Sequence, residues 1–250
     1  MQDLYIGDEG KGFPLVMVHG FLGSSNMWEP QVKFFKKHFR VITPDLPGFG
    51  KSNKVKSYKS IQSIASLLLK SLKKKKINKF HLLGHSMGGM VTQEMAKKSG
   101  KKISKLICYS TGPIGQMPGR FETVDESRKN LKKNGLEITV KNIAKTWFVK
   151  GESAKYFNIC LESGKLTSVE AADNAFIAFK NWNGVKNLKL IKNKTLVIWG
   201  DHDKSYTINQ AKILKKYISN SLLIIFKNCS HNIHLEKPYE FNNKLLNFLK

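Results

Sequence analysis

Six short apolar runs, separated for the most part by longer segments with helical spacing, constrain the fold of this chain more than any other feature. Their apolar residues are continuous, which is typical of strands buried on both faces of a parallel sheet. The runs occupy residues 14–20, 39–45, 79–86, 103–110, 194–201 and 221–226. Helices are expected near residues 26–37, 60–74, 87–99, 206–218 and 236–249. The pattern predicts an α/β protein with a mostly parallel sheet wrapped by helices, and the residues DLYI near the start could add an edge strand.

The interval from residue 111 to residue 192 breaks this rhythm. It is too long for a loop between two strands, and it mixes polar and apolar residues with several aromatic side chains. We therefore expect a core formed by residues 1–110 and 193–250, with a mostly helical cap inserted at 111–192.

Length and composition suit one domain with such an insertion. The chain has 250 residues, of which 41% are hydrophobic, so it can bury a sizeable core. It contains no run of 18 apolar residues, and its first residues lack the basic and apolar segments of a signal peptide. Three widely spaced cysteines suit reduced thiols. These features predict a cytoplasmic protein with no membrane association.

The formal net charge of +25 raises the question of nucleic-acid binding. Only three of the 43 basic residues are arginine, the side chain that reads guanine and binds phosphate through two hydrogen bonds. The lysines are spread over nearly every segment. We therefore expect a solvated basic surface and no nucleic-acid partner, with an acidic carrier protein as a weaker alternative.

Residues 40–53, RVITPDLPGFGKSN, end in Gly-Lys-Ser, as a phosphate-binding loop does. In such a loop another glycine precedes the final Gly-Lys-Ser by four intervening residues. Asp45 occupies that position here. A carboxylate would repel a nucleotide phosphate, and the polar residues that follow show no helix start. The motif therefore does not indicate a nucleotide site.

The strongest chemical signal is LLGHSMGGM at residues 82–90. Gly84-His85-Ser86-Met87-Gly88 fits the G-x-S-x-G elbow, in which a strand reverses into a helix and exposes a serine hydroxyl. An apolar strand precedes the motif and a helical segment follows it, as the elbow requires. Glycine is needed on both sides because a side chain would clash in so tight a turn. Ser86 is therefore the predicted nucleophile.

A serine hydroxyl needs a base, and the base needs an acid to orient it. Both should follow the serine in the order acid, then histidine. His231 follows the last strand and is preferred over His234, which lies three residues further from the strand end. Asp203 and Asp201 both follow the strand at 194–201, and Asp203 is preferred because it lies deeper in the loop. The predicted catalytic residues are thus Ser86, Asp203 and His231.

The oxyanion of an acyl-transfer reaction needs two hydrogen-bond donors. The amide of Met87 is the first candidate because it opens the helix after the serine. The amide of Phe21 is the second, because HGFLGSS at 19–25 follows the first strong strand. Gly20 and Gly23 allow this loop to approach the serine closely.

Taken together, these motifs resemble those of the alpha/beta-hydrolase superfamily over nearly the whole chain. The resembling stretches are VHGFLGSSNMW, DLPGFGKS, LLGHSMGG, LVIWGDHD and SHNIHLEKP. The resemblance implies a helical cap at 111–192, Asp203 as the acid, His231 as the base, and a loop at residues 45–52 that borders the site. One departure is Ser230, where the family usually has glycine.

The predicted reaction is acyl transfer to Ser86 and then to water, with no cofactor and no metal. The main hypothesis is a serine carboxylesterase that acts on a small-molecule ester. Alternatives are a carbon–carbon bond hydrolase or enol-lactonase for a ring-cleavage product, an ester hydrolase acting on an acyl carrier, and a non-catalytic receptor. The oligomeric state does not follow from the residues.

Side chains of the cap should select the substrate. Trp147, Trp182 and Met117 are the predicted substrate-binding residues, because aromatic and methionine side chains suit an apolar acyl pocket. A carbon–carbon bond hydrolase would also need a cation to bind the carboxylate of its substrate. Arg120 and Arg128 are the candidates for that role.

Overall fold

The computed structural model describes residues 2–116 and 118–250. In this part of the chain, seven strands form one sheet in the order β1-β3-β2-β4-β5-β6-β7. The strands are β1 (Ile6–Glu9), β2 (Pro14–Val18), β3 (Arg40–Pro44), β4 (Phe80–His85), β5 (Ile103–Tyr109), β6 (Lys194–Gly200) and β7 (Ser221–Phe226). Only β1 runs antiparallel to its neighbour, and all other pairs are parallel. The predicted mostly parallel sheet is confirmed.

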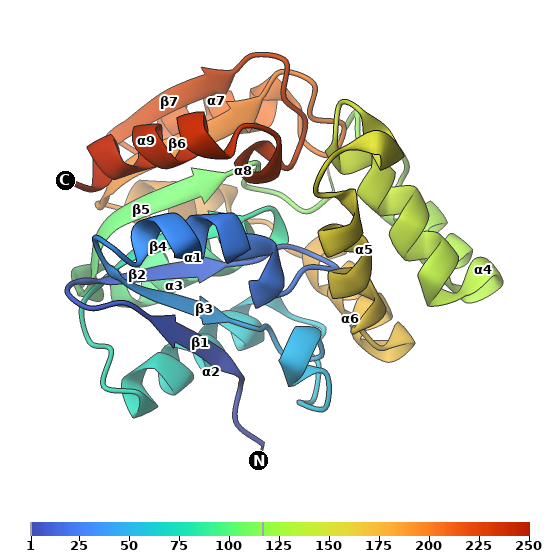
Figure 1. The fold of residues 1–250 in the computed structure, drawn as a ribbon, viewed down its shortest axis with the longest axis horizontal. Helices are drawn as coiled ribbons and strands as arrows, with labels where there is room; N and C mark the ends of the chain where they lie inside the picture. Colours follow the sequence, from blue (N-terminus) through green and yellow to red (C-terminus); the bar gives the residue numbers. More distant parts are fainter. Residues whose placement is uncertain (1, 117) are drawn as a thin grey trace.

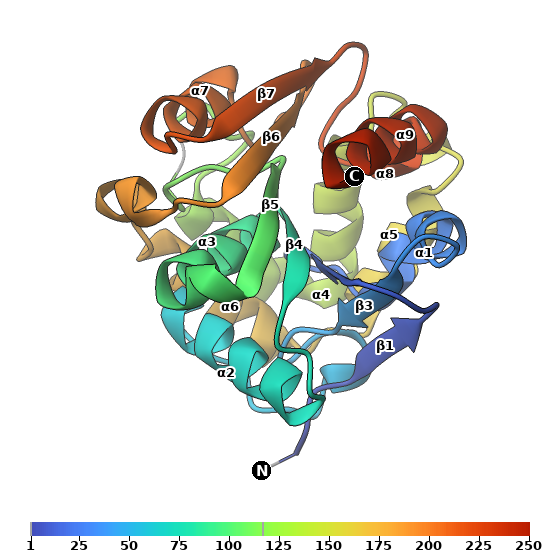
Figure 2. The ribbon, with the colours of Figure 1, turned by 90° about the vertical axis from the view of Figure 1, so that its left-hand side faces the viewer.

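Helices cover both faces of the sheet (Figures 1 and 2). In the same described residues they are α1 (Glu29–Phe35), α2 (Ile61–Lys74), α3 (Met87–Ser99), α4 (Val124–Ala144), α5 (Phe157–Lys165), α6 (Val169–Lys180), α7 (Ile208–Tyr217), α8 (Ile233–Glu236) and α9 (Pro238–Leu249). Helices α1 and α9 lie on one face, and α2, α3 and α7 lie on the other (Figure 2). The expected helix wrapping is therefore present.

The edge strand does not lie where the sequence indicated. The residues DLYI were expected to form it, but β1 begins at Ile6 and pairs with β3 through residues 6–9. The preceding backbone binds a loop instead: the Tyr5 amide donates to Ser52 Oγ (2.9 Å), and the Asp45 amide donates to the Tyr5 carbonyl (3.0 Å). The second contact continues the register of the β1–β3 pairing, and the first joins the chain before β1 to the loop at residues 45–52.

Alternating side chains of the buried strands supply two hydrophobic cores. On β2, Leu15 and Met17 pack with the α1 and α9 side, whereas Val16 and Val18 pack with the α2 and α3 side. All four are fully buried. Burial on both faces explains why the strands are apolar without alternation.

The segment between β5 and β6 carries α4, α5 and α6, which lie together beyond the carboxyl ends of the parallel strands (Figure 1). Helix α4 begins with a capping box in which Thr123 and Glu126 bind each other's backbone amides. The helix is kinked at Gly135, whose φ is 77°. Apolar side chains of these helices join the core on the α2 and α3 side.

Strand order also indicates where a ligand should bind. The chain passes from β2 to β3 on one side, then returns to place β4 on the other side of β2. In open α/β sheets, ligands bind at the carboxyl ends of the strands at such a reversal. The loops after β2 and β4 meet at this reversal, on the side of the sheet edge that faces helices α4 to α6.

Candidate active site

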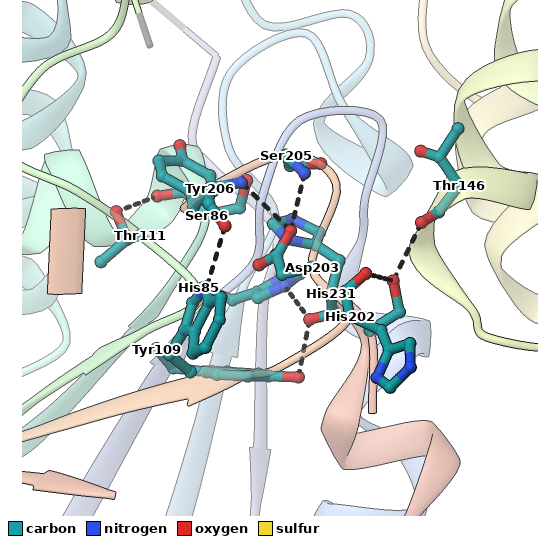
Figure 3. A network of polar contacts seen from close by, with 12 residues as sticks. His85, Ser86, Tyr109, Thr111, Thr146, His202, Asp203, Ser205, Tyr206 and His231 are labelled. Atoms are coloured by element: carbon teal, nitrogen blue, oxygen red, sulfur yellow. Dashed lines mark hydrogen bonds and ion pairs between the residues drawn. The ribbon is translucent and has the colours of Figure 1, made fainter. Parts of the chain in front are cut away.

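Ser86 lies between β4 and α3 in a backbone conformation that is rare for a residue with a side chain. Its φ is 56° and its ψ is −122°. Such strain costs on the order of 1–3 kcal/mol. The Ser86 amide donates to the Tyr109 carbonyl (3.0 Å), and its own carbonyl accepts from Thr111 Oγ1 (2.7 Å; Figure 3). Strand β5 and the turn after it therefore hold the serine in place.

Gly88 shows why the turn requires glycine. A Cβ at this position would lie 2.5 Å from the Val18 carbonyl oxygen and would also meet the carbonyl oxygen of His19. Both atoms belong to backbone that cannot move without disturbing β2. The first turn of α3 can therefore pack against β2 only because residue 88 has no side chain.

His231 and Asp203 form a buried pair, as Figure 3 shows. His231 Nδ1 lies 2.9 Å from Asp203 Oδ2, and the side chains are 2% and 0% exposed. The other carboxylate oxygen, Oδ1, accepts hydrogen bonds from the amides of Ser205 (2.7 Å) and Tyr206 (3.1 Å). Because an ionised carboxylate only accepts, the pair assigns the proton to Nδ1 and leaves Nε2 as the basic nitrogen.

The rival residues are engaged elsewhere. His234 Nδ1 lies 3.0 Å from the Tyr109 hydroxyl. Its burial, and then the charge of His231, lower the pKa of His234 to about 3. Asp201 binds His202 (2.8 Å) and the Cys229 amide (3.4 Å). Neither His234 nor Asp201 joins the His231–Asp203 pair.

Two buried side chains, Tyr109 and His85, contact the backbone of His231. Its carbonyl accepts a hydrogen bond from the Tyr109 hydroxyl (3.0 Å) and lies 3.2 Å from His85 Nε2. The rings of His85 and His231 have their centroids 4.6 Å apart. Burial is the main cause that lowers the pKa of His85 well below its usual value, followed by the nearby charges of His231 and His234. A neutral His85 therefore supports the loop without adding a charge beside His231.

Ser230 has a structural role that the sequence did not indicate. Its hydroxyl lies within hydrogen-bond distance of the carbonyls of Thr146 (3.0 Å) and His202 (3.2 Å). The amide of Asn232, two residues after Ser230, donates to the Trp147 carbonyl (3.0 Å). The loop that carries His231 is thus joined to the segment after α4 and to the loop that carries Asp203.

Ser86 and His231 line the same cavity, which has a volume of about 30 Å³. The cavity lies between the sheet edge and the helical segment above it. Its remaining walls are Phe21, Met87, Arg120, Phe121, Ile143, Trp147, Phe179, Ser205 and Tyr206. In the described residues no hydrogen bond joins Ser86 Oγ to His231, a common feature of sites before substrate binds. The shared cavity is what places the two groups within one site.

The predicted oxyanion donors lie at this cavity. Met87 is the first residue of α3, where an amide has no partner within the helix. No described residue accepts a hydrogen bond from the Phe21 amide. A Cβ on Gly20 would lie 2.8 Å from Ser86 Cβ, so the loop after β2 approaches the serine closely.

Comparison with known proteins identifies the family of the chain. A sequence profile of the alpha/beta hydrolase fold matches residues 14–238. The chain belongs to the alpha/beta hydrolase family. One relative of this hydrolase is 2-hydroxy-6-oxononadienedioate/2-hydroxy-6-oxononatrienedioate hydrolase 1 of Pseudomonas putida, which is 30% identical over 99% of this chain and 92% of its own length.

Two further matches extend over nearly the whole hydrolase. The (E)-2-((N-methylformamido)methylene)succinate hydrolase of Acinetobacter baylyi is 23% identical over 97% of this chain and 92% of its own. Among solved structures, an esterase from Exiguobacterium antarcticum superposes with a TM-score of 0.91, at 24% identity over 98% of this chain and 95% of its own. The structural likeness concerns the fold.

The predicted substrate-binding residues of the hydrolase differ in whether they line the cavity. Trp147 lines the cavity. Trp182 is not among its walls, because its indole nitrogen donates to the buried carboxylate of Glu94 (2.9 Å) and holds the end of α6 against α3. Met117 lies outside the described residues.

Tyr206 is a wall residue that the sequence analysis missed. Its ring lies parallel to that of His231, with an angle of 4° and 5.8 Å between centroids. Burial raises the pKa of the Tyr206 hydroxyl, whose hydrogen bonds to Ser86 and Thr111 act in the opposite direction. Its position three residues after Asp203 was the only available signal, and no motif marks it.

The loop at residues 45–52 is explained by what Asp45 binds. Its two carboxylate oxygens accept hydrogen bonds from the amides of Ser25 and Lys51. The amide of the next residue, Leu46, donates to His19 Nε2 (2.9 Å). The aspartate that excludes a nucleotide site therefore fixes the loop that carries Phe21.

Within residues 2–116 and 118–250, no group of three or more His, Cys, Asp or Glu side chains has the arrangement of a metal site. Over the same part of the chain, no helix combines the length and apolar character needed to cross a membrane.

Proposed function

We propose that this hydrolase is a serine carboxylesterase that cleaves small to medium carboxylic esters through an acyl-Ser86 intermediate. The observation that carries the proposal is the shared cavity, where Ser86 on a strained turn faces the same space as His231, which is paired with buried Asp203. A histidine fixed in one tautomer beside a serine at a helix start is the arrangement that acyl transfer requires.

The proposed reaction begins when His231 Nε2 takes the hydroxyl proton of Ser86 as the oxygen attacks the ester carbonyl. The amides of Phe21 and Met87 stabilise the oxyanion that forms. His231 then gives the proton to the departing alcohol. Water, activated by the same nitrogen, attacks the acyl-enzyme and releases the acid. Asp203 holds the imidazole and stabilises its charged form throughout.

The cavity of about 30 Å³ has room for little more than a water molecule or two, so an ester can enter only if its walls separate. Several of those walls belong to the segment 111–192, including Trp147 and Phe179. The contribution of this segment to the cavity walls supports the expected cap at 111–192. The acyl group would then bind between the cap and the sheet.

A small molecule suits this site better than an acidic carrier protein. A second hollow, of about 360 Å³, shares Arg120 with the cavity. Its other walls include Glu122 and Asp125, which would repel an acidic partner. We therefore propose a small-molecule substrate that does not depend on the lysine-rich surface.

A carbon–carbon bond hydrolase is the second candidate. The Pseudomonas putida relative acts, by its name, on a dioate that has a ketone and no ester or lactone linkage. The same three side chains can serve such a substrate because a vinylogous ketone also needs a base and an oxyanion site. Arg120, at the wall of the cavity, supports this alternative as well.

The test is labelling by a fluorophosphonate together with hydrolysis of 4-nitrophenyl esters of graded length. We expect labelling and burst release of nitrophenol in the wild type, and neither in Ser86→Ala. The matched control is Ser205→Ala, which removes another hydroxyl from the cavity wall but keeps the amide that binds Asp203. Equal labelling of wild type and Ser86→Ala would overturn the proposal. Faster turnover of a vinylogous diketone than of every ester would favour the second candidate.

A further inference from the structure

The three arginines of the chain differ in what they bind. Arg40 holds Asp8 through two hydrogen bonds, from Nε (2.8 Å) and Nη2 (2.6 Å). Arg128 holds Asp173 in the same way, from Nε (2.7 Å) and Nη2 (3.1 Å). Such paired contacts satisfy the planar edge of a guanidinium with a carboxylate. The pairing also removes Arg128 as a ligand for a substrate.

Arg120 has no such partner. Its Nη1 donates to the Glu122 carbonyl and to Ser127 Oγ (2.9 Å), which are neutral acceptors. Within the described residues, no carboxylate forms an ion pair with Arg120, and no acceptor binds its Nε or Nη2. The guanidinium is partly buried and lies 4.3 Å from the centre of the Phe121 ring. Burial lowers the pKa of Arg120, and the nearby charges of Glu122, Tyr206 and Glu126 act in the opposite direction.

The acids nearest to Arg120 bind other groups. The carboxylate of Glu122 accepts from Ser127 Oγ and from Asn130 Nδ2 (3.0 Å). The carboxylate of Glu126 is used by Thr123 in the capping box of α4. These bonds leave both acids in place at the start of α4, and the free edge of Arg120 stays without an anion.

Arg120 is also held in a fixed position at the cavity. It lines the same space as Ser86 and His231. The amide of the next residue, Phe121, donates to the Lys204 carbonyl (3.1 Å), one residue after Asp203. The backbone next to Arg120 is therefore joined to the loop that carries Asp203, while the guanidinium itself binds the Glu122 carbonyl and Ser127 of α4.

We propose that Arg120 is a specificity residue that binds a carboxylate group of the substrate, so that the natural substrate is an anionic ester. The inference rests on the proposed function, since it adds a charged group to the substrate of the same site. A partly buried cation with a free bidentate edge gains most from a carboxylate, because two charge-assisted hydrogen bonds form in a place shielded from water. The reacting carbonyl lies at Ser86, and the carboxylate lies at the Arg120 end of the cavity.

The experiment compares two esters of equal acyl length. 4-Nitrophenyl hydrogen glutarate carries a terminal carboxylate, and 4-nitrophenyl pentanoate does not. After correction for spontaneous hydrolysis, we expect a higher kcat/KM for the glutarate ester in the wild type. Arg120→Gln should lower kcat/KM for the glutarate ester by roughly 10- to 100-fold and for the pentanoate ester by less than about threefold. Arg120→Lys should recover part of the preference.

Arg128→Gln is the matched control, because it removes the same charge from a guanidinium that is already paired. It should leave the ratio of the two kcat/KM values unchanged. An equal loss on both esters in Arg120→Gln, or a wild type with no preference for the glutarate ester, would overturn the inference and leave the esterase proposal intact. Hydrolysis of neither ester would contradict the esterase proposal.

A binding measurement tests Arg120 independently of turnover and of the variant's activity. Glutarate should raise the melting temperature of the wild type more than its neutral diamide does. The difference should disappear in Arg120→Gln and persist in Arg128→Gln. If glutarate and its diamide act alike on the wild type, no carboxylate site exists at Arg120.

Discussion

Different interactions stabilise the carboxyl edge of the sheet and the helical segment 111–192. At the sheet edge, buried polar side chains bind the backbone of neighbouring loops, as Asp45 binds the amides of Ser25 and Lys51. In the segment 111–192, rings such as Phe176 and Phe179 pack against each other and join the apolar core. A hydrogen bond fixes a position to a few tenths of an ångström, whereas apolar contacts allow side chains to repack. The edge is therefore suited to hold catalytic groups in place, and the helical segment is suited to select the substrate.

The largest effect should follow from a change at the sheet edge. Asp203→Asn keeps the size of the side chain but can no longer stabilise a charged imidazole. We expect kcat to fall by roughly 10³- to 10⁴-fold, with an unchanged circular dichroism spectrum, since the role of the acid is electrostatic and orienting. Steady-state kinetics with the best ester measure this effect.

Asp201→Asn is the control for that change. Asp201 lies in the same loop but binds His202 and the Cys229 amide, away from His231. Its replacement should alter kcat by less than about threefold. If the two variants lost activity to the same degree, the assignment of Asp203 as the acid would be wrong.

The next effect tests how rigid the sheet edge is. Gly88→Ala places a Cβ against the backbone oxygens of Val18 and His19. We expect a loss of about 3 kcal/mol in the free energy of unfolding, because α3 must move away from β2. Urea denaturation followed by fluorescence measures the loss.

Gly100→Ala is the corresponding control. Gly100 follows α3 at its other end in a helical conformation, and its added Cβ would meet only Asn193 Oδ1, at 3.3 Å. We expect a change within about 1 kcal/mol. Equal destabilisation by both substitutions would show that the contact with β2 is not what demands glycine at position 88.

A smaller effect is expected at the end of α6, in the helical segment. Trp182→Phe leaves the buried Glu94 carboxylate without the indole hydrogen bond. We expect a loss of about 2 kcal/mol in stability, since a buried charged group loses a partner. Because Trp182 does not line the cavity, kcat/KM for short esters should change by less than about threefold.

Trp147→Phe should show the opposite balance. Trp147 lines the cavity, and its carbonyl, which binds Asn232, is retained in the variant. The substitution should change the preference for acyl length more than it changes stability. If Trp182→Phe altered the acyl preference and Trp147→Phe did not, the assignment of the cavity walls would be wrong.

The smallest effect concerns a histidine far from the site. His81 is buried between Phe13 and Phe39, and its Nδ1 has no partner in the described residues. Burial, and then the charge of Lys105, lower the pKa of His81 from 6.5 to about 4. The folded state therefore binds the proton less readily than the unfolded chain, so stability is fully present above pH 6.5 and is lost as the pH falls toward 4.

His81→Phe removes this titration. Between about pH 7 and pH 5.5, the wild type should lose roughly 1 kcal/mol more stability than the variant. Urea denaturation at both pH values measures the difference. Parallel losses in the two proteins would show that His81 does not take up a proton on unfolding in this range.

Much of the fold could be predicted from sequence because its signals are local. The six apolar runs became β2 to β7, since strands buried on both faces must be apolar throughout. The edge strand was misplaced by about three residues because its position is set by pairing with β3, a strand more than 30 positions away in the chain. No local pattern reports such contacts.

The candidate site divides in the same way. Residue types at fixed spacings predicted the serine turn, the preferred acid and histidine, and the glycines that let α3 approach β2. The folded structure was needed to show that Arg120 lines the cavity beside the predicted Trp147, that Trp182 binds Glu94 instead, and that Ser230 joins three segments. The physical reason is that these contacts link segments distant in the chain, through side chains whose type alone does not specify a partner.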